Sequence, residues 1–231
     1  MPKLHRISHT KIVSVILGAA VTAAASEAAA SHITFHSWDA ASEFSDSSNP
    51  SDNGAGPFSY GYETTLNNGT FLLLTHADNA APPIKGWQRT NNLTKGPFIT
   101  HNKTNVTKGP FGNAFVIYQP HGLSLHPGRQ CQYADLRFTA PQSGNYRISG
   151  QFYAMDYNAG TTTDVAVSVN GGQVFGGQIK FLGGPANASF TPSNLVAALQ
   201  PNDTIDFQVG CGANGDYFSD STGLDAVIEQ E

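Results

Sequence analysis

The sequence predicts an all-β fold, because strand patterns dominate it, turn signals are frequent and the length suits one sandwich. Three segments alternate apolar and polar residues with a period of two, at 146–153, 163–169 and 204–209. Such alternation, rich in β-branched and aromatic residues, is typical of half-buried strands. About 200 residues follow the first thirty, which is a usual size for a single β-sandwich.

Shorter runs and turn residues complete the predicted order of strands. Compact apolar runs at 70–75 and 113–118 are further candidate strands. Turn signals that contain Pro or Gly occur at 141–144, 170–172 and 201–203. The Asn-Gly-Gly sequence at 170–172 separates two strand candidates, and it therefore predicts a hairpin.

The two halves of the chain differ in pattern. Residues 31–112 are rich in Asn, Gly and Pro and show little periodicity, whereas 113–231 contain most of the clear strands. The helix-like stretch at 194–199 is too short to change the fold class, and we interpret 195–199 as a strand. We therefore predict one β-sandwich domain over 31–231 with a loop-rich N-terminal half.

The first thirty residues have the pattern of a secretory signal peptide. Three basic residues precede the uncharged apolar run Ile12–Ala25, and small residues follow as far as Ser31. Ala28 and Ala30 form an A-x-A pair, so we predict cleavage after Ala30. An uncleaved anchor is the alternative, although the apolar run is shorter than the roughly 20 residues of a membrane span. The expected location is extracellular or periplasmic.

The charge balance argues against two classes of partner. After residue 30 the chain has nine Lys and Arg against sixteen Asp and Glu, a formal charge of −7. No Lys or Arg follows Lys180, while seven acidic residues do. Nucleic acids and anionic membranes are bound through clustered basic residues, so we expect neither as a partner.

Cys131 and Cys211 are the only cysteines in the chain. In an exported protein a lone pair is expected to form a disulfide. Two buried thiols are the alternative. The wide spacing does not match that of a zinc site.

No catalytic residue can be assigned from local signatures. The chain lacks the G-x-S-x-G elbow of α/β-hydrolases, the H-E-x-x-H helix of metalloproteases and a glycine-rich phosphate loop after a strand. A glycosidase uses two facing carboxylates, and the acidic residues here lie on too many segments for such a pair to be chosen. That possibility stays open.

An acidic turn near the C-terminus is a candidate calcium site. Asp216, Asp220 and Asp225 lie among neutral oxygen-bearing residues, and calcium takes six to eight oxygen ligands. The spacing does not match an EF-hand loop. The alternative is a turn in which the Asp side chains accept hydrogen bonds from nearby backbone N–H groups.

Aromatic residues in the irregular half are candidate ligand-binding residues. The candidates are Trp38, Tyr60, Tyr62 and Trp87. An aromatic ring can stack on the apolar face of a sugar, while nearby amides bind its hydroxyls. The alternative for each ring is packing in the core, which takes most aromatic side chains of a sandwich.

Several strings, taken in order, resemble secreted bacterial domains of PEP-CTERM (exosortase-sorted) surface proteins. They are His36-Ser-Trp38, Gly56-Pro-Phe-Ser-Tyr-Gly-Tyr62, Leu125-His-Pro-Gly128, Leu136-Arg-Phe-Thr-Ala-Pro141, Thr161-Thr-Thr-Asp-Val165, Asn202-Asp-Thr-Ile-Asp-Phe207 and Asp220-Ser-Thr-Gly-Leu-Asp-Ala226. The resemblance implies a jelly-roll-like β-sandwich similar to carbohydrate-binding modules, and it implies no established activity. The chain ends at Glu231 without the family's sorting signal, so we do not expect exosortase sorting.

Taken together, these patterns favour a secreted, non-catalytic binding module that recognises a polysaccharide, a cell-surface glycan or another extracellular ligand. A structural or adhesive matrix component is the first alternative. A hydrolase or lyase that acts on polysaccharide is the second.

Overall fold

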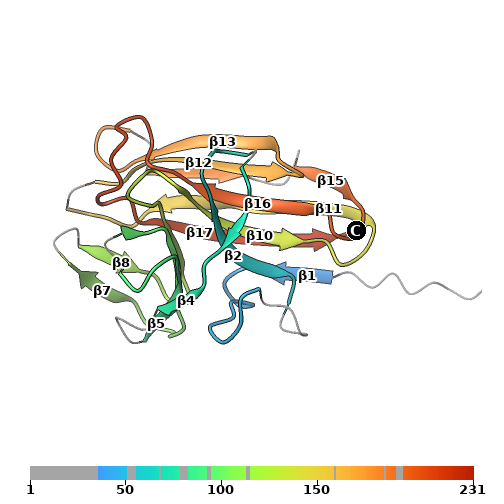
Figure 1. The fold of residues 1–231 in the computed structure, drawn as a ribbon, viewed down its shortest axis with the longest axis horizontal. Coiled ribbons are helices and arrows are strands. Elements are labelled where there is room, and N and C mark those ends of the chain that lie inside the picture. The colour runs from blue at the N-terminus through green and yellow to red at the C-terminus, as the bar shows by residue number, and fades with distance from the viewer. Residues whose placement is uncertain are drawn as a thin grey trace, which may run out of the picture. The chain divides into compact units, whose positions relative to one another are not determined.

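The structure is a computed structural model that describes residues 36–50, 56–67, 69–78, 83–92, 95–112, 115–158, 160–184, 186–190 and 195–231 (Figure 1). The predicted signal peptide, residues 1–30, lies outside this part of the chain. Among the described residues there is no helix of sufficient length and apolarity to cross a membrane. The described residues from His36 onward all belong to one compact unit.

Every named element of the described chain is a β-strand. The strands are β1 (His36–Asp39), β2 (Phe58–Glu63), β3 (Leu72–Leu73), β4 (His76–Asp78), β5 (Ile84–Gln88), β6 (Phe98–Asn102), β7 (Lys108–Phe111), β8 (Val116–Tyr118), β9 (Leu123–His126), β10 (Tyr133–Thr139), β11 (Gly144–Ala154), β12 (Thr162–Val169), β13 (Gly172–Lys180), β14 (Asn187–Phe190), β15 (Val196–Leu199), β16 (Thr204–Val209) and β17 (Thr222–Gln230).

These strands form two large antiparallel sheets and a small hairpin. The larger sheet has the order β14-β11-β17-β9-β6-β5-β4, with β1 beside β17 and β15 beside β11. The second sheet has the order β13-β12-β16-β10-β2-β3, and β7 pairs with β8 alone. From β9 to β12, and again from β15 to β17, successive strands alternate between the two large sheets. The fold is therefore an all-β, jelly-roll-like sandwich, as the sequence predicts.

The core lies between the inner faces of the two large sheets. Ile205, Phe207 and Val209 alternate with polar residues along β16, and all three are buried. Leu224 and Ile228 are likewise buried along β17 in the opposite sheet. These side chains belong to one cluster of buried residues. Burial of an aliphatic or aromatic side chain contributes about 1.5–3 kcal/mol, so this cluster is the main force that holds the sheets together.

The regular strands of the C-terminal half are where the alternation predicts them. The segments at 146–153, 163–169 and 204–209 lie within β11, β12 and β16. The turn at 170–172 joins β12 to β13 as a hairpin, and Asn170 has the positive φ of 49° that such a turn requires.

The N-terminal half contains more strand than its sequence pattern predicts. The strands β2, β5 and β6 each form long pairings, and only Leu72–Leu73 of the 70–75 run is a strand. In β5, Gly86 weakens the pattern, yet glycine is needed because a Cβ there would lie 2.7 Å from the Thr100 Cα of β6. Pairing with neighbours, rather than local alternation, forms these strands.

Candidate functional site

The indole of Trp38 is held in place by the core and faces a groove. On β1, Trp38 pairs with Ile228 of β17. Its ring meets that of Phe138 edge-on at 5.1 Å and stacks on that of Tyr146 at 5.9 Å, measured between ring centroids. The His36 ring stacks on the indole at 5.7 Å. Trp38 is half-buried, so part of its surface remains accessible.

The groove beside Trp38 is shallow and open, with a volume of about 460 Å³. Backbone hydrogen bonds fix its floor where β10 ends. The Thr139 N–H donates to the Pro57 carbonyl at 2.9 Å, and the Asn202 N–H donates to the Ala140 carbonyl at 2.9 Å. The lining residues are Trp38, Gly56, Pro57, Thr139, Ala140, Pro141 and Asn202.

This lining suits a neutral ligand that has both apolar and hydroxyl groups. It contains one aromatic ring, two prolines, a hydroxyl from Thr139 and an amide from Asn202, and none of its side chains is charged. Ligand sites are commonly built this way, from an apolar surface and a few polar groups that set orientation. Asn202 lies in a turn with a φ of 75°, and it is exposed at the groove.

Two of the other aromatic candidates belong to the core. Tyr60 is fully buried, and its hydroxyl accepts a hydrogen bond of 2.7 Å from the Ser45 N–H. Trp87 is 9% exposed, and its Nε1–H donates to the Ser45 carbonyl at 2.7 Å. Both rings hold the segment after β1 against the sandwich. We correct the sequence-based expectation accordingly, because neither ring has a free face on which a sugar could stack.

Tyr62 occupies a separate, intermediate position. It is half-buried on β2, and the Arg89 guanidinium lies 5.7 Å from its ring centroid. Of the four aromatic candidates, Trp38 is the one that lines the open groove. The four do not form one aromatic surface.

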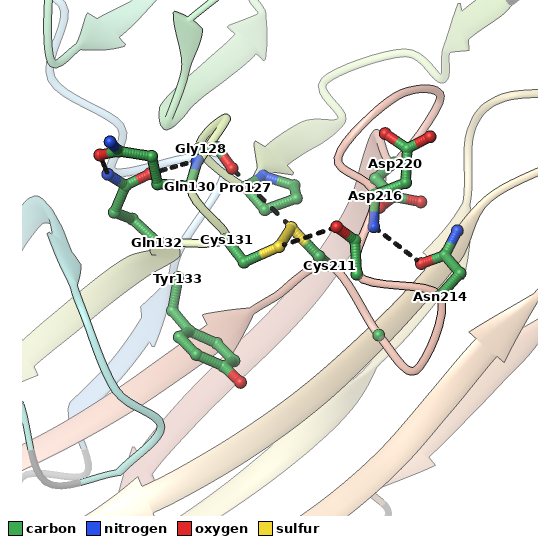
Figure 2. The surroundings of a disulfide bond; sticks show 12 residues. Pro127, Gly128, Gln130, Cys131, Gln132, Tyr133, Cys211, Asn214, Asp216 and Asp220 are labelled. Carbon is green, nitrogen blue, oxygen red and sulfur yellow. Dashed lines mark hydrogen bonds between the residues drawn. A yellow bond between two sulfur atoms is a disulfide. The ribbon is translucent and has the colours of Figure 1, made fainter.

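The predicted disulfide is present and joins two loops. Cys131 is bonded to Cys211 across a sequence separation of 80 residues (Figure 2). Cys131 lies in a tight turn in which its N–H donates to the Gly128 carbonyl at 2.8 Å. The bond thereby fixes the start of the loop from Cys211 to Asp220 against this turn. A disulfide is consistent with an extracellular protein.

The three carboxylates of the acidic turn do not form the predicted metal site. Asp225 is exposed on β17 and accepts a hydrogen bond of 2.9 Å from the Gln151 side chain. Asp216 accepts the Phe218 N–H at 3.0 Å within the loop, whereas Asp220 is buried. No group of three His, Cys, Asp or Glu side chains that could hold a metal occurs in the described part of the chain. Asp225 and Asp220 thus lie in different surroundings, because one is exposed on a strand and the other is buried.

A second buried carboxylate, which sequence reasoning missed, lies beside the end of this loop. Asp156, just after β11, is fully buried, as is Asp220. Burial raises the pKa of Asp156 to about 6 and the pKa of Asp220 to about 7. Asp156 lies far from the acidic turn in sequence, so no local spacing could have paired it with Asp220.

Polar side chains fill the outer face of the second sheet beneath a loop. We call residues 64–67 and 69–71, which connect β2 to β3, the crossing loop. Its Asn67 donates from its backbone to the Gln208 side chain at 3.0 Å and from its amide to Gln173 at 2.6 Å. Its Phe71 ring lies 4.1 Å from the Arg137 guanidinium. A Cβ on Gly61 would overlap that ring.

Three buried carboxylates share Arg137 under the crossing loop. The guanidinium contacts Asp206 at 2.5 Å and Glu63 at 3.4 Å. Gln208 donates to Glu63 at 3.0 Å and to Asp135 at 3.1 Å. Burial, then the charges of Asp206 and Glu63, raises the pKa of Asp135 well above its usual value. A raised pKa favours the protonated form of Asp135, and all three carboxylates are buried, so we interpret the cluster as a structural network.

Comparison with known proteins identifies no family. No family model matches the chain, and no curated protein matches it. A family 35 carbohydrate-binding module from Clostridium thermocellum is similar over 57% of this chain and 86% of its own, at 18% identity and a TM-score of 0.28. TmCBM61, in complex with β-1,4-galactotriose, is similar over 58% of this chain and 87% of its own, at 14% identity and a TM-score of 0.31.

A protein of another kind is also similar. The insecticidal delta-endotoxin Cry8Ea1 from Bacillus thuringiensis matches 48% of this chain and 19% of its own length, at 16% identity and a TM-score of 0.28. Identities and TM-scores of this size establish neither a family nor a ligand for this chain.

Proposed function

We propose that the protein is a secreted, non-catalytic module that binds a neutral polysaccharide in the groove beside Trp38. The observation that carries the proposal is the composition of this groove: an indole held by the core, flanked by prolines, a hydroxyl and an amide, without a charged side chain. The accessible part of the indole, beside the His36 ring that stacks on it, would pack against the apolar face of a sugar ring. Asn202 would bind hydroxyls at its edge.

The groove is preorganised, which favours binding. The rings of Phe138 and Tyr146 hold Trp38 in place. Backbone hydrogen bonds join the segment at Pro57 and the turn at Asn202 to the end of β10. A site that is already ordered loses little conformational entropy when a ligand binds. Its shallow, open form suits a chain that passes across the surface rather than a small molecule that must be enclosed.

Binding should be measured by isothermal titration and affinity electrophoresis with soluble galactan, xylan, mannan and β-glucan. Trp38→Phe keeps an aromatic ring against the core but reduces the stacking surface, and Asn202→Asp keeps the shape of the turn while replacing the amide donor. Both variants should weaken binding at least several-fold with melting temperatures close to the wild type. Trp87→Phe is the matched control, because it trims a buried indole away from the groove, and its affinity should equal that of the wild type once folding is confirmed.

Three results would contradict the proposal. If the wild type binds none of the polysaccharides, the structural or adhesive alternative is favoured. Release of reducing sugar from any of them by the wild type would instead favour the enzymatic alternative. Binding that survives both groove variants would place the ligand elsewhere on the protein.

A further inference from the structure

Asp156 and Asp220 are buried acids whose hydrogen bonding is incomplete. Both side chains have no solvent exposure. One oxygen of Asp156, Oδ2, accepts the Ser221 N–H at 2.6 Å, and one oxygen of Asp220, Oδ1, accepts the Thr162 N–H at 2.9 Å. The remaining oxygens, Asp156 Oδ1 and Asp220 Oδ2, are buried and have no hydrogen-bond partner. Buried polar atoms of native proteins are nearly always bonded, so two such atoms require an explanation.

The two carboxylates belong to one small network. The Asp156 N–H donates to the Thr161 hydroxyl at 3.3 Å, and this hydroxyl donates to the Ser221 carbonyl at 3.3 Å. Asp156 thus contacts residues 161 and 221, while Asp220 contacts residue 162 and directly precedes residue 221. Both carboxylates therefore lie where the segments 161–162 and 220–221 run side by side.

Within the described part of the chain, no basic side chain forms an ion pair with these acids. None of the ion pairs among the described residues includes Asp156 or Asp220. An ionised carboxylate in a buried position is costly unless a cation or several donors compensate it. Either protons or a metal ion must supply that compensation.

The neighbouring oxygen atoms are of the kind that binds a hard cation. The Thr163 and Thr222 hydroxyls are 2.9 Å apart beside the network, and the Thr161 hydroxyl and Ser221 carbonyl are part of it. The contacts of both carboxylates are with oxygen- or nitrogen-bearing groups of Ser and Thr, and both cysteines of the chain are in the disulfide. Carboxylate, hydroxyl and carbonyl oxygens are the ligands that calcium prefers.

We infer that Asp156 and Asp220 are the two carboxylate ligands of a calcium ion that joins the loop after β11 to the end of the disulfide-linked loop. The site retains Asp220 of the sequence-predicted trio and replaces Asp216 and Asp225 with Asp156. Figure 2 shows that Asp220 lies on the loop that begins at Cys211. The ion would thus fix the far end of a loop whose near end the disulfide already fixes. This inference does not depend on the proposed polysaccharide binding.

The test is the calcium response of the full, disulfide-bonded protein after treatment with chelator and dialysis. A ligand that binds only the folded state raises the melting temperature by mass action. At calcium concentrations 100-fold above the dissociation constant, the melting temperature should rise by about 5–10 °C for a domain of this size. Isothermal titration should show one calcium per chain, and magnesium at equal concentration should give a smaller rise.

Isosteric variants locate the ion. Asp156→Asn and Asp220→Asn remove one charge each without changing the shape, and both should abolish the rise in melting temperature and the stoichiometric binding. Asp225→Asn is the matched control, because it removes an exposed carboxylate of the same acidic segment, and it should respond as the wild type does.

Three outcomes would overturn the inference. The wild type could bind no calcium by titration and keep one melting temperature with calcium or chelator. The response could persist in Asp156→Asn and Asp220→Asn. Alternatively, both variants could be more stable than the wild type without calcium, while calcium leaves the melting temperature of the wild type unchanged. That result would mean that protons compensate the two carboxyl groups.

Discussion

The disulfide allows a quantitative prediction about stability. Replacing both cysteines, as C131A/C211A, removes a covalent link between residues separated by 80 positions and leaves the local packing nearly unchanged, because alanine retains the Cβ. In the chain-entropy treatment, closing a loop of 80 residues lowers the entropy of the unfolded state enough to stabilise the folded protein by about 4.5 kcal/mol at 25 °C. That is a large part of the roughly 5–15 kcal/mol by which domains are normally stable.

The assay is urea unfolding at equilibrium, followed by tryptophan fluorescence and circular dichroism. The oxidised wild type should exceed the double variant by about 4.5 kcal/mol, and the wild type in reducing agent should match the double variant. The unfolded variant should also expose more surface, which gives a larger m-value. A difference below about 1 kcal/mol, with coincident transitions in both probes, would refute the entropic reasoning. Labelled thiols in denatured, unreduced protein would refute the bond itself.

Three further changes test the packing and the buried charges. Trp87→Ala should destabilise the fold by about 3–5 kcal/mol in urea unfolding, since it empties a core position and removes the bond to Ser45; a loss under 1 kcal/mol would contradict the core assignment. Asp135→Asn should gain stability over the wild type as the pH rises above 4, because burial raises the pKa of Asp135 in the folded state and the unfolded chain therefore releases this proton at a lower pH; a gap in melting temperature that does not vary with pH would count against it. Burial lowers the pKa of His101 to about 4 from 6.5, so the unfolded chain binds its proton first as the pH falls. His101 alone should therefore lower stability by about 2 kcal/mol between pH 7 and 5, and His101→Gln should lack this share of the drop.

The parts of the fold that sequence reasoning predicted are those with strong local patterns. The strands β11, β12 and β16 alternate apolar and polar residues, so their position and their inward faces could be inferred. The strands β5 and β6 carry glycine, histidine and threonine on positions fixed by neighbouring strands, and their local sequence contains no comparable signal. Their pairing depends on tertiary contacts, which a single sequence does not display.

The candidate sites show the same division. Trp38 could be nominated from its residue type, but only the structure separates it from Tyr60 and Trp87, whose rings are buried by the segment after β1. Asp220 could be nominated from the acidic turn. Asp156 could not, because its proximity to Asp220 results from the crossing of distant segments.

The contact between Gly61 and Phe71 has a consequence for sequence variation. The Phe71 ring occupies the space in which a side chain at position 61 would lie, and it also covers the Arg137 guanidinium. A larger residue at 61 would require a smaller one at 71, and the guanidinium would then be open to water. Among relatives with this architecture, positions 61, 71 and 137 should therefore change as a linked set, with glycine, an aromatic residue and arginine inherited together or lost together.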